Sequence, residues 1–197
     1  MSAPRLILAS TSRYRRELLE RLRLPFEVVS PDVDESPRAR EAPAALAMRL
    51  ALAKAAAVAV HAADAVVIGS DQVAELDGQA IGKPLTHQVA VAQLRAMSGR
   101  RVVFHTAVAV VRRDRGFSRS LLAPVIVTFR SLTDPEIEHY LRTEQPYDCA
   151  GSAKSEALGV ALLAAIESDD PTALIGLPLI RTCTLLREAG LDPLAPR

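Results

Sequence analysis

Three arginines follow three hydroxyl residues in one short stretch near the start of the chain. Residues 10–12 read Ser-Thr-Ser, and Arg13, Arg15 and Arg16 come directly after them. Leucines at a helical spacing continue the stretch, so the hydroxyl residues suit a helix N-cap and the arginines fall in the first turn. The positive end of the helix dipole disfavours cations there, and a bound phosphate would compensate for it. Pairing of the arginines with glutamates four residues further on explains this stretch equally well when it is taken alone.

Two acidic residues stand where a buried strand or a rigid loop would hold them. Asp71 closes an apolar run that begins at Ala65, and an acid in such a position is costly unless it is paired. A metal ion, or a charge that develops during a reaction, would account for it. Glu35 lies in a proline-closed loop after the second strand of an expected strand–helix–strand unit, where α/β folds keep their ligands. For Asp32 in the same loop, turn formation is the better explanation.

Two isolated lysines complete the set of candidate residues. Lys54 is the only lysine in an alanine-rich helix, and Lys83 lies in the segment Gly82-Lys-Pro, where proline restricts the backbone. Taken alone, each lysine is better explained as an ordinary surface residue. The segment at Gly82 is not a P-loop, because the required glycine spacing and the following Ser or Thr are missing.

Together these residues have the composition of a site for a polyphosphate. Cations would disperse the charge of the phosphates, while acids would hold Mg²⁺ or activate water. The four histidines, at positions 61, 87, 105 and 139, are scattered along the chain, and no nucleophile has a base partner. Hydrolysis by an activated water is therefore favoured over a covalent route.

The pattern of apolar residues predicts one α/β domain, residues 1–197, that would position these side chains. Short strands are expected on both sides of the first helix and before Asp71, and two longer strands later in the chain. Turn and capping signals mark four further helices. The expected strands cover residues 6–9, 26–29, 65–72, 73–76 with 79–81, 102–111, 121–129 and 159–166, and these helices cover 42–62, 86 to a stop at 98–99, 133–142 and a last one ending at 189.

Composition excludes several classes of partner. The 197 residues are 49% hydrophobic, enough to bury a substantial core. The 24 Lys and Arg balance 23 Asp and Glu, so we expect neither nucleic acid nor an anionic membrane as a partner. We also expect no membrane span and no signal peptide, and hence a cytoplasmic location. Cys149 and Cys183 lack the spacing of a zinc site or a disulfide framework.

Seven short motifs occur in register along nearly the whole chain: Ser10-Thr-Ser-Arg-Tyr-Arg-Arg-Glu-Leu-Leu, Val33-Asp-Glu, Gly69-Ser-Asp-Gln, Gly82-Lys-Pro, Phe129-Arg-Ser-Leu-Thr, Cys149-Ala-Gly-Ser and Gly176-Leu-Pro-Leu. Together they resemble the Maf family of nucleoside triphosphate pyrophosphatases. The resemblance implies a mixed, twisted sheet flanked by helices, in two lobes with a deep cleft, similar to the inosine triphosphate pyrophosphatases. It also implies cleavage of a nucleoside triphosphate between the α and β phosphates, with a divalent cation, Mg²⁺ or Mn²⁺.

The resemblance assigns a role to each candidate residue by its position in these motifs. Asp71 matches the catalytic base, and Glu35 matches an accompanying acid that would hold the divalent cation together with Asp71. Positions that would bind the triphosphate and stabilise the departing diphosphate carry a hydroxyl or a positive charge, and they are Ser10, Arg15, Arg16, Lys54 and Lys83.

The segment that begins at Cys149 resembles the branch of this family that acts on 7-methyl-GTP, rather than the branch that acts on dTTP and UTP. In that branch the positions of Tyr14, Gln72 and Glu156 set the base preference, and Tyr14 replaces the usual tryptophan. An aromatic face attracts the cationic 7-methylguanine ring, and a carboxylate accepts from its N–H groups. Related modified nucleotides, dTTP or UTP, and a non-catalytic nucleotide-binding regulator of cell division stay open as alternatives. The family often forms dimers, so a homodimer is also considered.

Overall fold

The computed structural model describes residues 4–195 and contains one mixed sheet with the strand order β2-β1-β3-β5-β6-β7, to which β4 adds beside β3. Strand β1 is parallel to its neighbours β2 and β3, and the remaining pairs are antiparallel. The prediction of a mixed α/β sheet is confirmed. The strands are β1 (Leu6–Ala9), β2 (Glu27–Val29), β3 (Val66–Leu76), β4 (Gln79–Ile81), β5 (Arg101–Arg112), β6 (Phe117–Phe129) and β7 (Leu163–Glu167).

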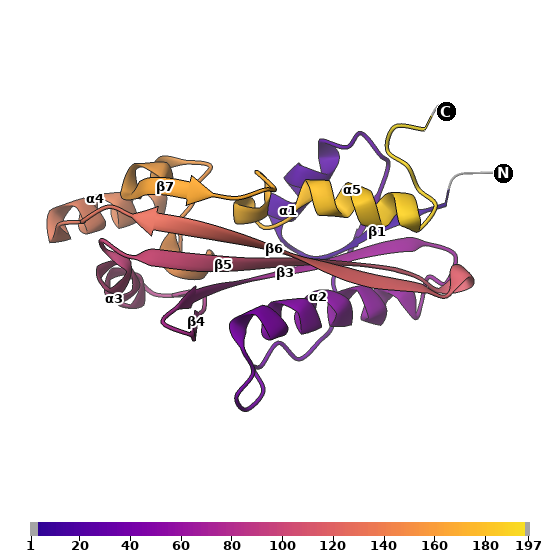
Figure 1. The fold of residues 1–197 in the computed structure, drawn as a ribbon, viewed down its shortest axis with the longest axis horizontal. Coiled ribbons are helices and arrows are strands. Elements are labelled where there is room, and N and C mark those ends of the chain that lie inside the picture. The colour runs from indigo at the N-terminus through magenta and orange to yellow at the C-terminus, as the bar shows by residue number, and fades with distance from the viewer. Residues whose placement is uncertain (1–3, 196–197) are drawn as a thin grey trace.

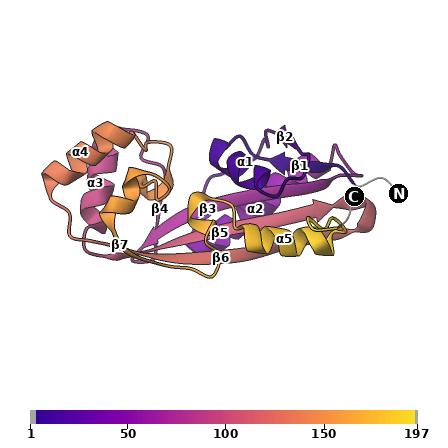
Figure 2. The ribbon, with the colours of Figure 1, turned by 90° about the horizontal axis from the view of Figure 1, so that it is seen from above.

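Helices cover both faces of the sheet and gather into two lobes. Helix α2 lies on one face, and α1 and α5 lie on the other (Figure 1). Helices α3 and α4 form a separate group with β7 at the far end of the sheet, while the long strands β3, β5 and β6 reach into both groups (Figure 2). The helices are α1 (Arg13–Glu20), α2 (Pro43–Ala59), α3 (His87–Met97), α4 (Asp134–Glu144) and α5 (Leu179–Glu188).

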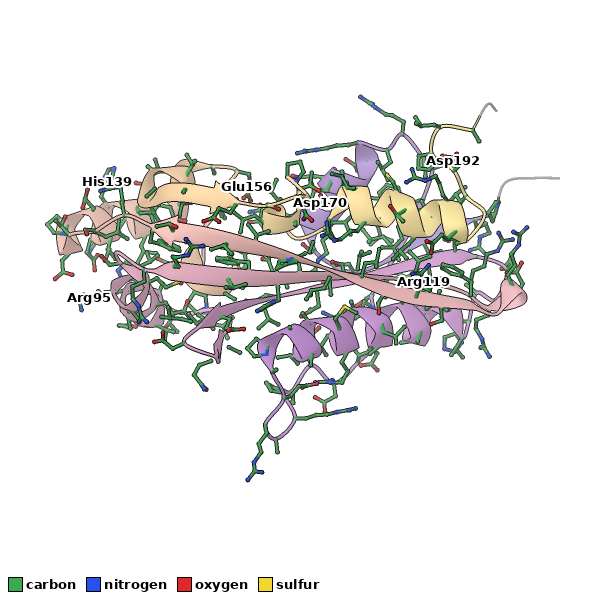
Figure 3. The ribbon with its side chains drawn as sticks, in the orientation of Figure 1. Arg95, Arg119, His139, Glu156, Asp170 and Asp192 are labelled. Carbon is green, nitrogen blue, oxygen red and sulfur yellow. The ribbon has the colours of Figure 1, made fainter. Side chains whose placement is uncertain are left out.

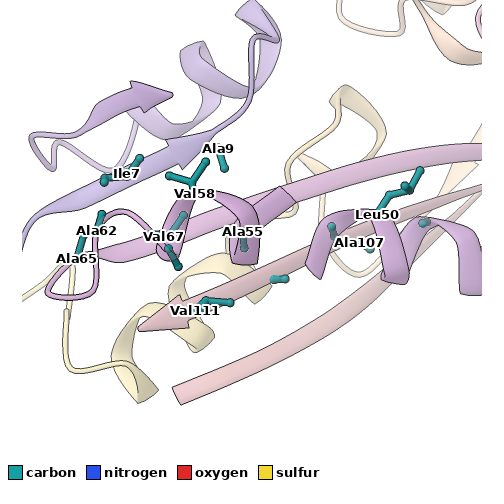
Figure 4. Close-up of a cluster of buried hydrophobic side chains, with 14 of the residues drawn as sticks. Ile7, Ala9, Leu50, Ala55, Val58, Ala62, Ala65, Val67, Ala107 and Val111 are labelled. Carbon is teal, nitrogen blue, oxygen red and sulfur yellow. The ribbon is translucent and has the colours of Figure 1, made fainter. Parts of the chain in front are cut away.

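Helix α2 packs tightly against β3 at Gly69. A Cβ atom there would collide with the carbonyl oxygen of Ala51 and lie 2.6 Å from the backbone nitrogen of Ala55, so a larger residue does not fit. Alanines and valines fill this contact, as the close-up of the cluster shows (Figure 4). Side chains alternate along a strand, so Asp71, two residues beyond Gly69, also faces α2.

Most of the expected elements are confirmed, and three differ. Strand β6 begins at Phe117 and not at residue 121, because residues 117–120 already pair with β5. Strand β3 was expected to end near Asp71, but it continues to Leu76 because residues beyond Asp71 keep pairing with β5. The segment expected as a strand over 159–166 begins as a 3₁₀ turn, Leu158–Leu162, and becomes a strand only at Leu163. There, a Cβ on Gly159 would lie 2.7 Å from the backbone nitrogen of Lys154, so the chain turns too closely for an extended run. None of the helices within residues 4–195 combines the length and apolar character needed to cross a bilayer.

Glu136 makes the stability of α4 sensitive to acid. The Thr133 N–H donates to its carboxylate at 2.7 Å and Arg130 pairs with it at 2.8 Å, and these contacts lower the pKa of Glu136 to about 2. A lowered folded-state pKa gives stabilisation that is present above the unfolded value and is lost as pH falls toward 2. We expect Glu136→Gln to lower the melting temperature at pH 7 and much less at pH 2.5. The exposed Asp32→Asn change is the control, and equal losses at both pH values would contradict the prediction.

Candidate active site

The loop between β1 and α1 is organised by its own hydroxyl groups. The Ser12 side chain caps α1 by accepting from the Arg15 N–H at 3.4 Å, as the sequence predicts. The buried Ser10 hydroxyl accepts from the Ser12 N–H at 3.1 Å. It also lies 3.5 Å from the guanidinium of Arg15, so the loop, the helix start and one arginine meet at Ser10.

The two predicted phosphate-binding arginines of α1 point in different directions. The Arg15 Nε donates to the Gly176 carbonyl at 3.0 Å. Burial lowers the pKa of the Arg15 guanidinium, and the charges of Asp71 and Glu35 oppose that shift. Arg16 instead pairs with Glu20 at 3.0 Å, with 64% of its side chain exposed. Arg16 therefore forms an ordinary ion pair on the helix surface, whereas Arg15 lies near Asp71 and Glu35.

Lys54 joins the two predicted acids at the centre of the site. Its ammonium lies 2.7 Å from the Asp71 carboxylate and 2.9 Å from the Glu35 carboxylate. The Lys54 side chain is 6% exposed and that of Asp71 10%, whereas Glu35 is open to solvent at 57%. Helix α2, strand β3 and the loop after β2 each contribute one residue to this cluster, which we call the Lys54 cluster.

The Lys54 cluster has ligands that suit a hard divalent cation. Two carboxylate oxygens, from Glu35 and Asp71, converge on one small cationic group. Mg²⁺ is typically held by one or two carboxylates together with substrate phosphates and water. Within residues 4–195 no group of three or more His, Cys, Asp or Glu side chains is arranged to hold a metal. A cation here would therefore take its remaining ligands from the substrate and from water.

Tyr14 connects α1 to the loop before a short 3₁₀ turn, Ala150–Ser152, in the lobe of α3, α4 and β7. Its hydroxyl donates to Asp148 at 3.4 Å and accepts from Arg13 at 2.8 Å, and the Cys149 thiol lies 3.8 Å from it. The Arg13 guanidinium also lies 4.8 Å from the centre of the Tyr14 ring. Partial burial raises the pKa of Tyr14. Tyr14 thus lies where the two lobes approach each other.

The other predicted residues occupy different surroundings. Gln72 faces away from Asp71, and its amide NH₂ lies within hydrogen-bonding distance of the Thr106 hydroxyl and the carbonyls of Ala173 and Leu174, at 2.9–3.1 Å. Lys83 is exposed just after β4, and Glu156 is exposed in the lobe of α4 and β7 (Figure 3). Among the ion pairs of the described chain, none joins Lys83 or Glu156 to the Lys54 cluster.

Comparison with known proteins identifies the family. A family model described as "Maf-like protein" matches residues 5–189, nearly the full chain. The chain belongs to the Maf family. This confirms the resemblance seen in the seven motifs.

Close relatives of this Maf chain carry one common name. Proteins named "7-methyl-GTP pyrophosphatase" match it at 67% identity in Polaromonas sp., over 98% of this chain and 88% of that protein, and at 64% in Albidiferax ferrireducens, over 98% and 99%. A protein of the same name in Thiobacillus denitrificans is 55% identical over 98% of this chain and 96% of its own length.

The sequence did not predict that the backbone of residues 173–176 would accept hydrogen bonds from side chains of the Maf site. The Gly176 carbonyl accepts from Arg15 and from the buried Ser70 hydroxyl, and the Ala173 carbonyl accepts from Gln72 and Thr106. The segment 170–178 contains Asp-Pro and the family motif Gly-Leu-Pro-Leu begins in it, but neither pattern by itself assigns a role in the site to its backbone. The sequence signal that could have pointed to this segment is its Pro, Gly and Asp content, which is typical of a turn. A turn brings several backbone carbonyls close together, and here they accept hydrogen bonds from the site.

Proposed function

We propose that this Maf protein is a nucleoside triphosphate pyrophosphatase that hydrolyses 7-methyl-GTP to 7-methyl-GMP and diphosphate. The observation that carries the proposal is the buried Lys54 ammonium between Glu35 and Asp71, with Arg15 beside them. The names of the relatives support the same reaction and the same base. A role in clearing modified nucleotides from the cytoplasmic pool is part of this proposal.

The groups in the site suit attack by water on a triphosphate. Asp71 would accept a proton from the water whose oxygen forms the new bond to phosphorus. The bond between the α and β phosphates breaks, the monophosphate keeps the water oxygen, and diphosphate leaves. Arg15 and Lys54 would stabilise the negative charge that gathers on the leaving group. Ser10 would hold a phosphate oxygen at the start of α1, where backbone N–H groups face outward.

Glu35 and Asp71 would hold the divalent cation, Mg²⁺ or Mn²⁺. When bound, such an ion disperses the charge of the phosphate oxygens. Lys54 now pairs with both carboxylates, and its single positive charge leaves the three groups with one net negative charge. When a cation binds the carboxylates, the Lys54 ammonium would turn to a nearby phosphate oxygen. The exposed Lys83 is proposed to reach the same phosphates from the β4 side.

Tyr14, Gln72 and Glu156 remain the proposed base-specificity residues. The Tyr14 ring suits a cationic base, which an aromatic face attracts by about 0.5–2 kcal/mol. Glu156 is exposed and free to accept from the N–H groups of guanine. Because the Gln72 amide NH₂ is already held by Thr106 and by the 173–174 carbonyls, we propose that Gln72 acts by fixing that turn.

The proposal is tested by diphosphate release from a panel of nucleoside triphosphates, normal and methylated, with and without a chelator. We expect the highest kcat/KM for 7-methyl-GTP and loss of turnover when the chelator is present. Highest kcat/KM for dTTP or UTP would place the protein in the other branch of the family. Nucleotides that bind but remain intact would favour the non-catalytic regulator.

Arg15 and Arg16 are expected to differ in their effect on catalysis. A charge-assisted hydrogen bond contributes about 1.5–3 kcal/mol, so Arg15→Met should lower kcat/KM for 7-methyl-GTP about 10- to 100-fold. Arg16 would have to leave Glu20 to reach a phosphate, so Arg16→Met should lower kcat/KM by less than about threefold, the scale of an exposed pair. Steady-state kinetics of both variants test this, and equal losses would show that both arginines bind the triphosphate.

A further inference from the structure

A two-pronged ion pair closes the loop that carries Glu35. The Arg49 Nε lies 2.6 Å from one oxygen of Glu41, and its Nη2 lies 2.7 Å from the other. The two side chains are only 20% and 10% exposed. A fork-to-fork pair of this kind fixes orientation as well as distance, unlike a single-point surface pair.

Arg49 also holds the loop backbone next to Glu35. The same Nη2 donates to the Ser36 carbonyl at 3.0 Å, and the Arg38 N–H donates to the Glu41 carboxylate at 3.0 Å. One guanidinium therefore ties residues 36–41 together and fastens them to α2. We call the Arg49–Glu41 pair with its Ser36 contact the loop clamp.

The Glu35 loop needs such a clamp because it buries little of itself. Residues 34–40 are all exposed, so apolar packing does little to hold them. Among the ion pairs of the described residues, that with Lys54 is the one Glu35 makes. Arg49 and Lys54 lie on the same helix, α2, so one rigid element carries both the anchor of the loop and the partner of Glu35.

We propose that Arg49 is a positioning residue that acts through the Ser36 backbone to hold the Glu35 carboxylate where it and Asp71 bind a divalent cation. The inference rests on the proposed function for the identity of the substrate, but its test does not require turnover. The loop clamp also stays charged at neutral pH. Hydrogen bonding from Arg49, and then from the Arg38 backbone, lowers the pKa of Glu41 to about 2, so the carboxylate stays ionised.

The test is a titration of the full chain with Mn²⁺ in the absence of nucleotide, in which electron paramagnetic resonance measures the bound Mn²⁺. We expect Arg49→Met and Glu41→Gln each to weaken Mn²⁺ binding about five- to tenfold, and Arg49→Lys, which keeps the charge but not the fork, to weaken it less. The matched control is Arg119→Met, which removes another Arg–Glu pair on the α5 face of the sheet and should leave Mn²⁺ affinity unchanged (Figure 3).

A double-mutant cycle separates positioning from general stability. If Arg49 acts through Glu35, Arg49→Met should have no further effect on Mn²⁺ affinity in a Glu35→Gln background. Faster trypsin cleavage after Arg38 or Arg40 in Arg49→Met would report the released loop. Three outcomes would each overturn the inference. Arg49→Met could leave the Mn²⁺ affinity unchanged, it could lower that affinity as much in the Glu35→Gln background as in the unmodified chain, or the unmodified chain could fail to bind Mn²⁺. Nucleotides left intact by a protein whose Mn²⁺ affinity follows the cycle would overturn only the proposed function.

Discussion

Asp71→Asn is expected to remove nearly all turnover and to spare most of the nucleotide binding. The amide is nearly the same size as the carboxylate, but it cannot take a proton from water. Loss of a general base typically costs about 10²–10⁴-fold in rate, and the loss of a cation ligand adds to it. We therefore expect kcat for 7-methyl-GTP to fall at least about 10³-fold, with the dissociation constant of the nucleotide changed by less than about tenfold.

Glu75→Gln supplies a control on the same strand and the same face of the sheet. Glu75 also has a close partner, His105 at 2.7 Å, but it lies outside the Lys54 cluster. Single-turnover rates and equilibrium binding of both variants should show a large kcat loss for Asp71→Asn alone. Near-normal turnover in Asp71→Asn would refute the role of Asp71 as the base.

Lys54→Met is expected to damage both stability and catalysis. The change leaves the 10%-exposed Asp71 carboxylate without its closest partner, and breaking a buried ion pair costs up to about 3–5 kcal/mol. Arg15 is near enough to offset part of that cost. Chemical unfolding should show the loss in stability, and kcat should fall by about 10²-fold because one stabilising charge on the departing diphosphate is missing.

The double variant Lys54→Met/Asp71→Asn separates these effects. Removal of both charges leaves no buried unpaired ion, so stability should partly return, whereas turnover should remain as low as in Asp71→Asn. If the double variant unfolds as readily as Lys54→Met, the lost stability comes from the packing of the lysine stem and not from the unpaired carboxylate.

Signals that act within a few residues predicted the local structure well. The Ser12 cap at the start of α1 and the end of α3 just before Ser98 were both readable, because capping depends on neighbouring residues. The predicted end of β3 was wrong because it depends on contacts between residues far apart in the sequence. Polar residues at 70–72 resembled the end of a strand, but Ser70 and Gln72 find acceptors on distant segments, which local sequence does not reveal.

The site itself depended on information that local patterns lack. Arg15 and Arg16 are neighbours in one turn, and the helix rotation of about 100° between them puts one beside Gly176 and the other beside Glu20. Contact between Lys54 and Asp71 depends on how closely α2 approaches the sheet, which Gly69 permits. Family motifs pointed to these residues, but only the packing shows which of them meet.

Three long strands shared by both lobes limit how the protein can open. Strand β5 pairs with β3 from Val67 to Glu75 and with β6 along its whole length, so these ladders continue without a break between the lobes. A hinge motion there would have to rupture backbone hydrogen bonds in the middle of a sheet. Movement near the site would then fall to the irregular segments around Glu35 and around Asp148, while the shared strands hold the two lobes in place. Such a scaffold favours movement of its loops over closure of one lobe onto the other.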